Sequence, residues 1–211
     1  MLQDNLTVKG DLVNSDVQNK DINGFKIFLE GALTFAANGR FRGTTILEFS
    51  GANSPTVDLS GITDKDFALD IIVNKSGGAL TLSGTLRLAG AWTYTAGTVT
   101  VTGSTAQFFG TKNLNSGTMA WNNLTIAGDT RTLTGALDVN GNLTISAATT
   151  LSAGSNNINC AGNFTNSGTF TAGTSTLKFD GISTVAGSTT FYNLQILTGS
   201  TVHLTSTQTF T

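Results

Sequence analysis

Four aspartates in the first third of the chain form the densest group of residues that could carry acid–base chemistry. Cleavage of a glycosidic bond needs two carboxyl groups that face each other across the bond. The group consists of Asp58, Asp64, Asp66 and Asp70. Because Asp64 and Asp66 flank Lys65 in a short polar segment, the pattern is more typical of a solvated loop between strands than of a paired catalytic site. We therefore predict no catalytic residue in this group.

Two further reactive side chains stand alone in the sequence. His203 alternates onto the same face as Thr201 and Thr205, with no acidic residue nearby, which indicates an exposed surface histidine. Cys160 alternates onto the apolar face and is predicted to be a buried, unreactive thiol. A single cysteine also excludes an intrachain disulfide and a cysteine-built zinc site. The sequence predicts no catalytic residue, no metal site and no cofactor, and hence a protein that is not an enzyme.

Hydroxyl side chains are the commonest polar groups, and they alternate with apolar residues. Their spacing predicts an outward strip of threonines, about 4.8 Å apart between stacked strands. Such a regular array could bind ice, bind glycans weakly or pack against another chain, although threonine is also simply a favourable strand residue. The candidate surface-binding strip comprises Thr93, Thr95, Thr98, Thr100, Thr102, Thr169 and Thr171.

Four Asn-x-Thr triplets formally match glycosylation acceptors. They begin at Asn5, Asn123, Asn142 and Asn163. All four asparagines precede short alternating segments, so each lies where a strand is predicted to start. We interpret them as parts of the strand-start geometry.

The segments that position these residues are short, and apolar and polar residues alternate along them. Examples are residues 79–83, 98–102 and 142–146, separated by clusters of Gly, Asn and Ser. Period-two alternation with abundant β-branched residues predicts strands, and the glycines supply corners. The chain is therefore predicted to be all-β.

Charge is scarce and unevenly distributed. Charged residues make up 11% of the 211 residues, the net charge is −2, and residues 139–211 contain only Lys178 and Asp180. No run of like charge exceeds two residues, so nucleic acid is not an expected partner. No apolar stretch approaches the roughly 20 residues of a membrane span.

A long internal repeat defines the predicted architecture. Three similar segments begin near Phe41, Tyr94 and Phe170, and the second interval between them is longer than the first. The excess is about one coil of a parallel β-helix, and residues 141–162 fit an inserted coil. The sequence thus predicts a right-handed parallel β-helix with coils of about 20–26 residues, since solenoids tolerate whole-coil insertions.

The two ends of the sequence differ. Residues 1–40 are polar and charged and are predicted to form an N-terminal cap or first coil, whereas residues 41–211 form the repeats. The last residues end in mid-strand, so we expect the native protein to continue beyond Thr211 or to dock there on a partner. The first residues lack the basic and apolar regions of a signal peptide.

The segment of residues 162–173, followed by Phe191-Tyr192-Asn193-Leu194, carries a family resemblance. It resembles the Thr/Asn/Gly-rich parallel β-helix proteins of phage structural and fibre proteins and of bacterial surface adhesins. The resemblance implies a non-catalytic, elongated structural or adhesive module, extracellular, on a virion or bacterial cell surface. It also implies self-association, contact with other surface proteins, or a glycan receptor.

We favour a phage tail fibre, spike or decoration protein, with a secreted bacterial adhesin as the alternative. A polysaccharide-degrading β-helix enzyme and an ice-binding protein are further alternatives, because both classes also use parallel coils.

Overall fold

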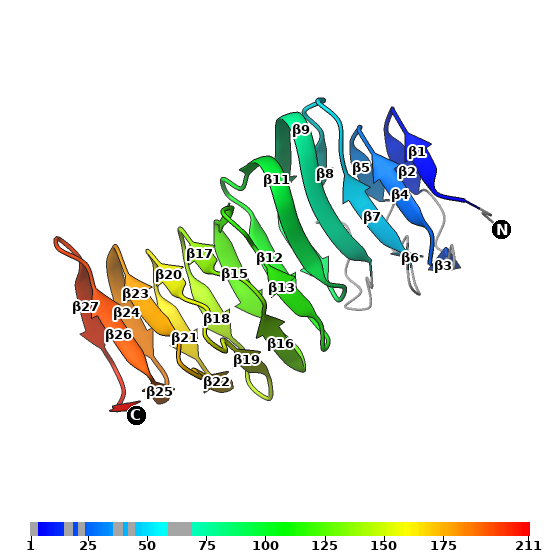
Figure 1. The fold of residues 1–211 in the computed structure, drawn as a ribbon. Helices are drawn as coiled ribbons and strands as arrows, with labels where there is room; N and C mark the ends of the chain where they lie inside the picture. The colour runs from blue at the N-terminus through cyan, green and yellow to red at the C-terminus, as the bar shows by residue number, and fades with distance from the viewer. Residues whose placement is uncertain (1–3, 15–18, 21–23, 36–39, 42–44, 59–68) are drawn as a thin grey trace. The chain divides into compact units, whose positions relative to one another are not determined.

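A computed structural model describes residues 4–14, 19–20, 24–35, 40–41, 45–58 and 69–211. The chain is all-β, with parallel strands stacked as a solenoid of about nine turns (Figure 1). The predicted fold class is therefore confirmed. In the described part of the chain, no helix is long and apolar enough to cross a membrane. The chain divides into two compact units, residues 1–105 and residues 106–211, which are described separately below.

Unit 1 consists of residues 1–105 and contains two main strand stacks. The first stack runs β1-β4-β7-β9-β11, the second runs β2-β5-β8 and rejoins β9, and β3 pairs with β6. The bounds are β1 (Leu6–Val8), β2 (Leu12–Asn14), β3 (Asn19–Lys20), β4 (Lys26–Leu29), β5 (Leu33–Phe35), β6 (Arg40–Phe41), β7 (Ile46–Phe49), β8 (Thr56–Asp58), β9 (Asp70–Ser83), β10 (Thr85–Leu88) and β11 (Trp92–Thr100).

Part of the segment predicted as a cap forms regular coils. Strand β1 pairs with β4 in parallel register, Leu6 opposite Ile27, and β4 continues into β7, Ile27 opposite Leu47. Leu47 in turn lies opposite Ile71 of β9, after a slightly longer coil. The capping role of residues 1–40 stays a prediction.

Unit 2 consists of residues 106–211 and has three strand stacks. These are β13-β16-β19-β22, β12-β15-β18-β21-β24-β27 and β14-β17-β20-β23-β26, and β25 also pairs with β28. The bounds are β12 (Thr105–Phe108), β13 (Asn113–Asn115), β14 (Ala120–Trp121), β15 (Asn123–Ile126), β16 (Thr130–Leu133), β17 (Leu137–Val139), β18 (Leu143–Ile145), β19 (Thr150–Ser152), β20 (Ile158–Cys160), β21 (Phe164–Asn166), β22 (Thr169–Thr171), β23 (Thr176–Phe179), β24 (Ile182–Ala186), β25 (Thr189–Phe191), β26 (Asn193–Ile196), β27 (Thr201–Leu204) and β28 (Gln208–Phe210).

The register of unit 2 shows that the repeating unit is the single coil. Leu124 pairs with Leu143, Leu143 pairs with Phe164, and Phe164 pairs with Val185, each one coil further along the chain. Residues 141–162 do form one coil, as predicted, but the coils on either side are of the same kind. Nothing therefore marks that coil as an insertion, and the intervals between the three predicted copies each cover several coils.

Inward-facing apolar residues fill the interior of unit 2. Strand alternation directs one side chain in two toward the core, and these are buried in successive coils. Phe164, Phe170 and Phe191 form one aromatic cluster, with ring centroids 5.8 to 6.1 Å apart. Such contacts stabilise the stack beyond the area that they bury. Arg131 is also buried, where its Nη2 donates to the carbonyl of Phe109 and its guanidinium lies over the Phe108 ring.

Glycines form corners where the chain turns and where two coils approach closely. Gly187 has φ of 85°, and a Cβ there would lie 1.8 Å from the carbonyl oxygen of Asn166 in the preceding coil. Only glycine satisfies both constraints, since other residues rarely adopt positive φ and a Cβ would collide. This agrees with the corner role predicted for the Gly-rich clusters.

Candidate functional site

Of the four aspartates considered for acid–base chemistry, two lie in the described part of the chain. Asp58 is exposed in β8, and Asp70 begins β9. The carboxylate of Asp70 accepts a hydrogen bond of 2.8 Å from the backbone N–H of Ala91, one coil further on. Asp70 thus has a coil-linking role. Asp64 and Asp66 lie outside the described residues.

The isolated histidine and cysteine lie where the sequence predicts. His203 is exposed in β27, opposite Thr184 of β24. Cys160 is completely buried in β20, and burial raises the pKa of its thiol to about 12. At neutral pH the thiol is therefore protonated and a poor nucleophile.

The asparagines of all four Asn-x-Thr triplets link one coil to the next. The Oδ1 atoms of Asn123 and Asn142 accept from the backbone N–H groups of Asn142 and Asn163, each at 2.9 Å. Asn163 accepts from Thr184 in the same way, at 2.8 Å. In unit 1, Asn5 accepts from Lys26. This ladder of side chain–backbone bonds explains why asparagine recurs at strand starts, as the sequence predicts.

The part of the predicted threonine strip in unit 1 does not form a continuous lattice. Thr93, Thr95, Thr98 and Thr100 belong to β11, and Thr102 follows it; all but the half-buried Thr93 are exposed. The register between β11 and β9 shifts twice between Tyr94 and Thr98. Of these threonines, only Thr100 is in register with hydroxyl residues on the neighbouring strands. It pairs with Thr81 of β9, which pairs in turn with Thr56 of β8.

The part of the strip in unit 2 belongs to a larger hydroxyl lattice. Thr169 and Thr171 are the exposed ends of two rows, which run across β16, β19 and β22. The rows are Thr130-Thr150-Thr169 and Thr132-Ser152-Thr171. Adjacent hydroxyls are separated by about 4.8 Å across strands and about 6.6 Å along them. The sequence prediction missed Thr130, Thr132, Thr150 and Ser152. The recurrence of Thr-x-Thr or Thr-x-Ser at residues 130–132, 150–152 and 169–171, about one coil apart, is the signal that identifies them.

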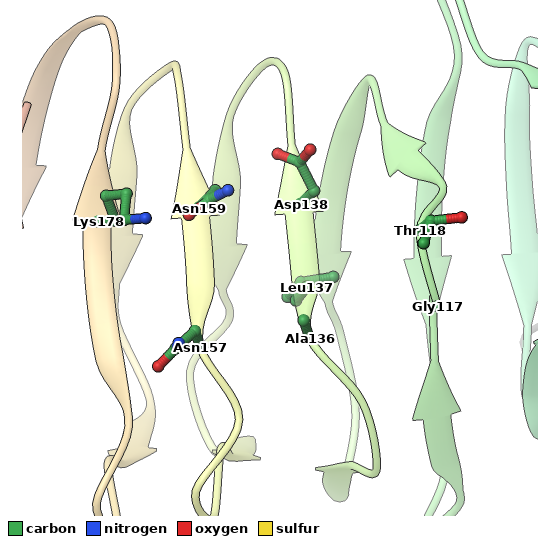
Figure 2. Close-up of a pocket in the computed structure, with 8 residues that line it drawn as sticks. All are labelled: Gly117, Thr118, Ala136, Leu137, Asp138, Asn157, Asn159 and Lys178. Atoms are coloured by element: carbon green, nitrogen blue, oxygen red, sulfur yellow. The ribbon is translucent and has the colours of Figure 1, made fainter.

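A polar groove lies on the outer face of β17, β20 and β23. It encloses about 280 Å³ and is lined by Gly117, Thr118, Ala136, Leu137, Asp138, Asn157, Asn159 and Lys178. Figure 2 shows Asp138, Asn159 and Lys178 at the same level on three neighbouring strands. Asp138 pairs with Asn159, and Asn159 pairs with Lys178, so the three side chains form one row across consecutive coils. We call this feature the β17–β23 groove.

The β17–β23 groove gathers much of the charge of unit 2. Of the six charged residues in 106–211, Asp138 and Lys178 line the groove, and Asp180 lies close enough to act on Asp138. Burial raises the pKa of the Asp138 carboxyl above its ordinary value, and the nearby charge of Asp180 adds to this rise. A row that presents a carboxylate, an amide and an ammonium group can both accept and donate hydrogen bonds.

A second hollow, in unit 1, uses its polar groups internally. It is lined by residues that include Asp11 and Ser54. Asp11 accepts from the backbone N–H of Ala32, and Ser54 accepts from that of Ala79. These side chains hold corners together, so the β17–β23 groove is the stronger candidate for binding.

The described residues contain no group of three or more His, Cys, Asp and Glu side chains placed to hold a metal ion. Comparison with family models, curated proteins and solved structures finds no match to the chain.

Proposed function

We propose that this protein is a non-catalytic structural and adhesive module of an exterior surface. The carrying observation is that two outer faces of unit 2, over β15-β18-β21 and over β16-β19-β22, carry rows of Thr and Ser in register above an apolar core. Thr125, Thr144 and Thr165 form one such row and Thr130, Thr150 and Thr169 another. An uncharged hydroxyl surface on a stacked scaffold suits display and contact rather than turnover.

Our first candidate setting is a phage virion appendage, such as a tail fibre, spike or decoration protein. This setting comes from the resemblance of residues 162–173 to the Thr/Asn/Gly-rich coils of phage structural and fibre proteins. A secreted bacterial adhesin is the alternative.

The genes that flank the coding sequence test the setting. Capsid and tail genes would support the virion appendage, whereas a secretion system without viral neighbours would contradict it. The non-catalytic part is tested by incubation with a panel of capsular polysaccharides. Their chain length should stay constant, and a fall in chain length would overturn the proposal.

The hydroxyl lattice of β16, β19 and β22 favours ice binding as a second candidate function. Its two rows present hydroxyl groups in a regular array, and Thr150 lies at the centre of one row. An ice-binding face predicts thermal hysteresis and faceted ice crystals, both lost in Thr150→Lys. Rounded crystals without hysteresis from the unmodified protein would remove this candidate.

A further inference from the structure

We infer that the β17–β23 groove binds a linear, uncharged glycan, with one sugar placed over each coil. The inference rests on the proposed adhesive function and names its partner class. Its central feature is the row of Asp138, Asn159 and Lys178, in which successive side chains are about 4.8 Å apart. That step is close to the rise of one sugar unit in an extended polysaccharide. A chain laid across the strands therefore meets an equivalent position in every coil.

The chemistry of the groove matches that of sugar hydroxyls, which both donate and accept hydrogen bonds. The Asp138 carboxylate accepts, the Lys178 ammonium donates, and the Asn159 amide does both. Thr118 and Asn157 add a hydroxyl and an amide to the lining. The Asn157 Oδ1 already accepts from the backbone N–H of Thr176, which fixes the amide and leaves its NH₂ group to donate to a ligand.

Asn159 is the centre of this arrangement. It lies between the two charged members of the row and is partly exposed on β20, while its neighbours Ile158 and Cys160 are completely buried. Because both neighbours are packed in the core, the backbone that carries Asn159 is rigidly held. A backbone that is already ordered at this position loses little conformational entropy when a ligand binds.

The charges of the groove disfavour anionic partners. Asp138 lines the groove and Asp180 lies close enough to raise the Asp138 pKa, so two negative charges accompany the single positive charge of Lys178. Phosphates, nucleic acids and uronic acid chains would be repelled by this excess. An uncharged glycan meets no such barrier.

A peptide strand is disfavoured by the hydrogen bonding of the sheet. Strand addition requires a free sheet edge. β17 pairs with β14 and β20, and β23 pairs with β20 and β26, so none of the strands under the groove has a free edge. An apolar ligand is disfavoured as well, since Leu137 in the lining is only 1% exposed and the remaining contacts are largely polar.

If the glycan lies across the strands, its affinity should depend on the number of sugars it contains. Each added sugar reaches a further member of the row until the row is covered, and Gln195 of β26 extends it beyond Lys178. Affinity should therefore rise from disaccharide upward and then level off. A ligand that bound only at one position would show no such rise.

The test uses the full chain and NMR titration, which detects the weak binding expected of a groove without an aromatic platform. The probes are cello-, malto- and N-acetylated chito-oligosaccharides, from disaccharide to hexasaccharide. At least one series should shift the amide signals of residues 138, 159 and 178, with affinity increasing with length. Asn159→Ala should weaken binding about tenfold, the equivalent of one lost hydrogen bond of about 1.4 kcal/mol.

Thr184→Ala is the matched control, because Thr184 is a partly exposed strand residue of the same unit, on β24 and outside both the groove lining and the hydroxyl rows. It should leave affinity unchanged. The inference is overturned if no series shifts the groove signals, or if Thr184→Ala weakens binding as much as Asn159→Ala does. Shortening of the oligosaccharides during the titration would instead overturn the non-catalytic function, so the two failures are distinguishable.

Discussion

The side-chain oxygen of Asn142 accepts a hydrogen bond from the backbone N–H of Asn163, one coil later in the chain, at 2.9 Å. The bond joins the starts of two consecutive strands, β18 and β21, which are themselves paired. The Asn142 side chain thus adds one hydrogen bond between the two coils immediately before the backbone pairing of β18 with β21 begins. Consecutive coils are thus held in register by a specific polar contact as well as by apolar packing.

We predict that Asn142→Ala lowers the free energy of unfolding by about 0.5–1.5 kcal/mol, the usual net contribution of one hydrogen bond. Urea unfolding followed by circular dichroism measures the change. Asn159→Ala is the control, because the side chain of Asn159, unlike that of Asn142, makes no coil-linking hydrogen bond with the described residues. Equal effects of the two substitutions would show that the ladder adds nothing specific.

The thiol of Cys160 should be unreactive in the folded protein. It is 0% exposed, and its pKa of about 12 keeps it protonated at neutral pH. Since the thiolate is the reactive form, a thiol reagent such as DTNB should not label the native protein and should label one thiol after unfolding in urea. Rapid labelling without denaturant would contradict the burial of β20.

Asp138 should make stability depend on pH. Its folded pKa is raised above the ordinary value of 3.8, so the folded state binds more protons than the unfolded state between the two values. The contribution of Asp138 to the free energy of unfolding is therefore most favourable below the ordinary pKa and is lost as pH rises through the folded pKa. Asp138→Asn should raise stability at neutral pH and flatten this dependence, as measured by urea unfolding across the acidic range.

The converse experiment adds a carboxylate one coil away from Asp138, whereas Asp138→Asn removes one. Ala120→Asp places a second carboxylate directly opposite Asp138, on the side away from Lys178, and like charges in paired positions destabilise a sheet. It should lower stability at neutral pH and restore it in acid. If Asp138→Asn proves less stable than the unmodified protein at neutral pH, the raised pKa is wrong.

The aromatic cluster of unit 2 should be its most sensitive core site. Phe191 is completely buried, with ring centroids 6.1 Å from both Phe164 and Phe170. Phe191→Ala should cost about 3–5 kcal/mol, through lost burial and the cavity left behind. Phe210→Ala is the control, because Phe210 stacks on Phe191 but is 57% exposed. Its cost should be clearly smaller in thermal or urea unfolding.

Much of the fold could be predicted from alternation, because a strand buries every second residue whatever its neighbours. Cys160 and His203 were placed correctly on this basis, inward and outward. The repeat length was harder to predict. The aromatic residues that open the three predicted copies do not mark equivalent places: Phe41 lies in β6, Tyr94 is half-buried in β11, and Phe170 is buried in β22. Any apolar residue can occupy an inward position, so aromatic identity does not define the coil.

The groove could not be predicted from the sequence in the same way. Asp138 and Lys178 are distant in the sequence and meet in one row only because one coil brings Asp138 opposite Asn159 and the next brings Asn159 opposite Lys178. An error of one residue in either coil would turn the side chain to the opposite face of the sheet. Register of this accuracy comes from backbone pairing. The scarcity of charge after residue 138 was the only sequence signal that pointed to these residues.

In unit 2, residues that pair on neighbouring strands are separated by a nearly constant number of residues along the chain. This regularity has a consequence for the folding pathway. In unit 2 each new coil closes a loop of nearly the same length as the one before, so the entropy lost at every step is nearly the same. No single long-range contact has to form first, and an existing coil offers its strand edges as the template for the next. We therefore expect growth by successive addition from a nucleus at almost any coil, with fraying confined to the terminal coils. Folding of this kind can keep pace with synthesis on the ribosome, because each coil can dock as soon as it emerges.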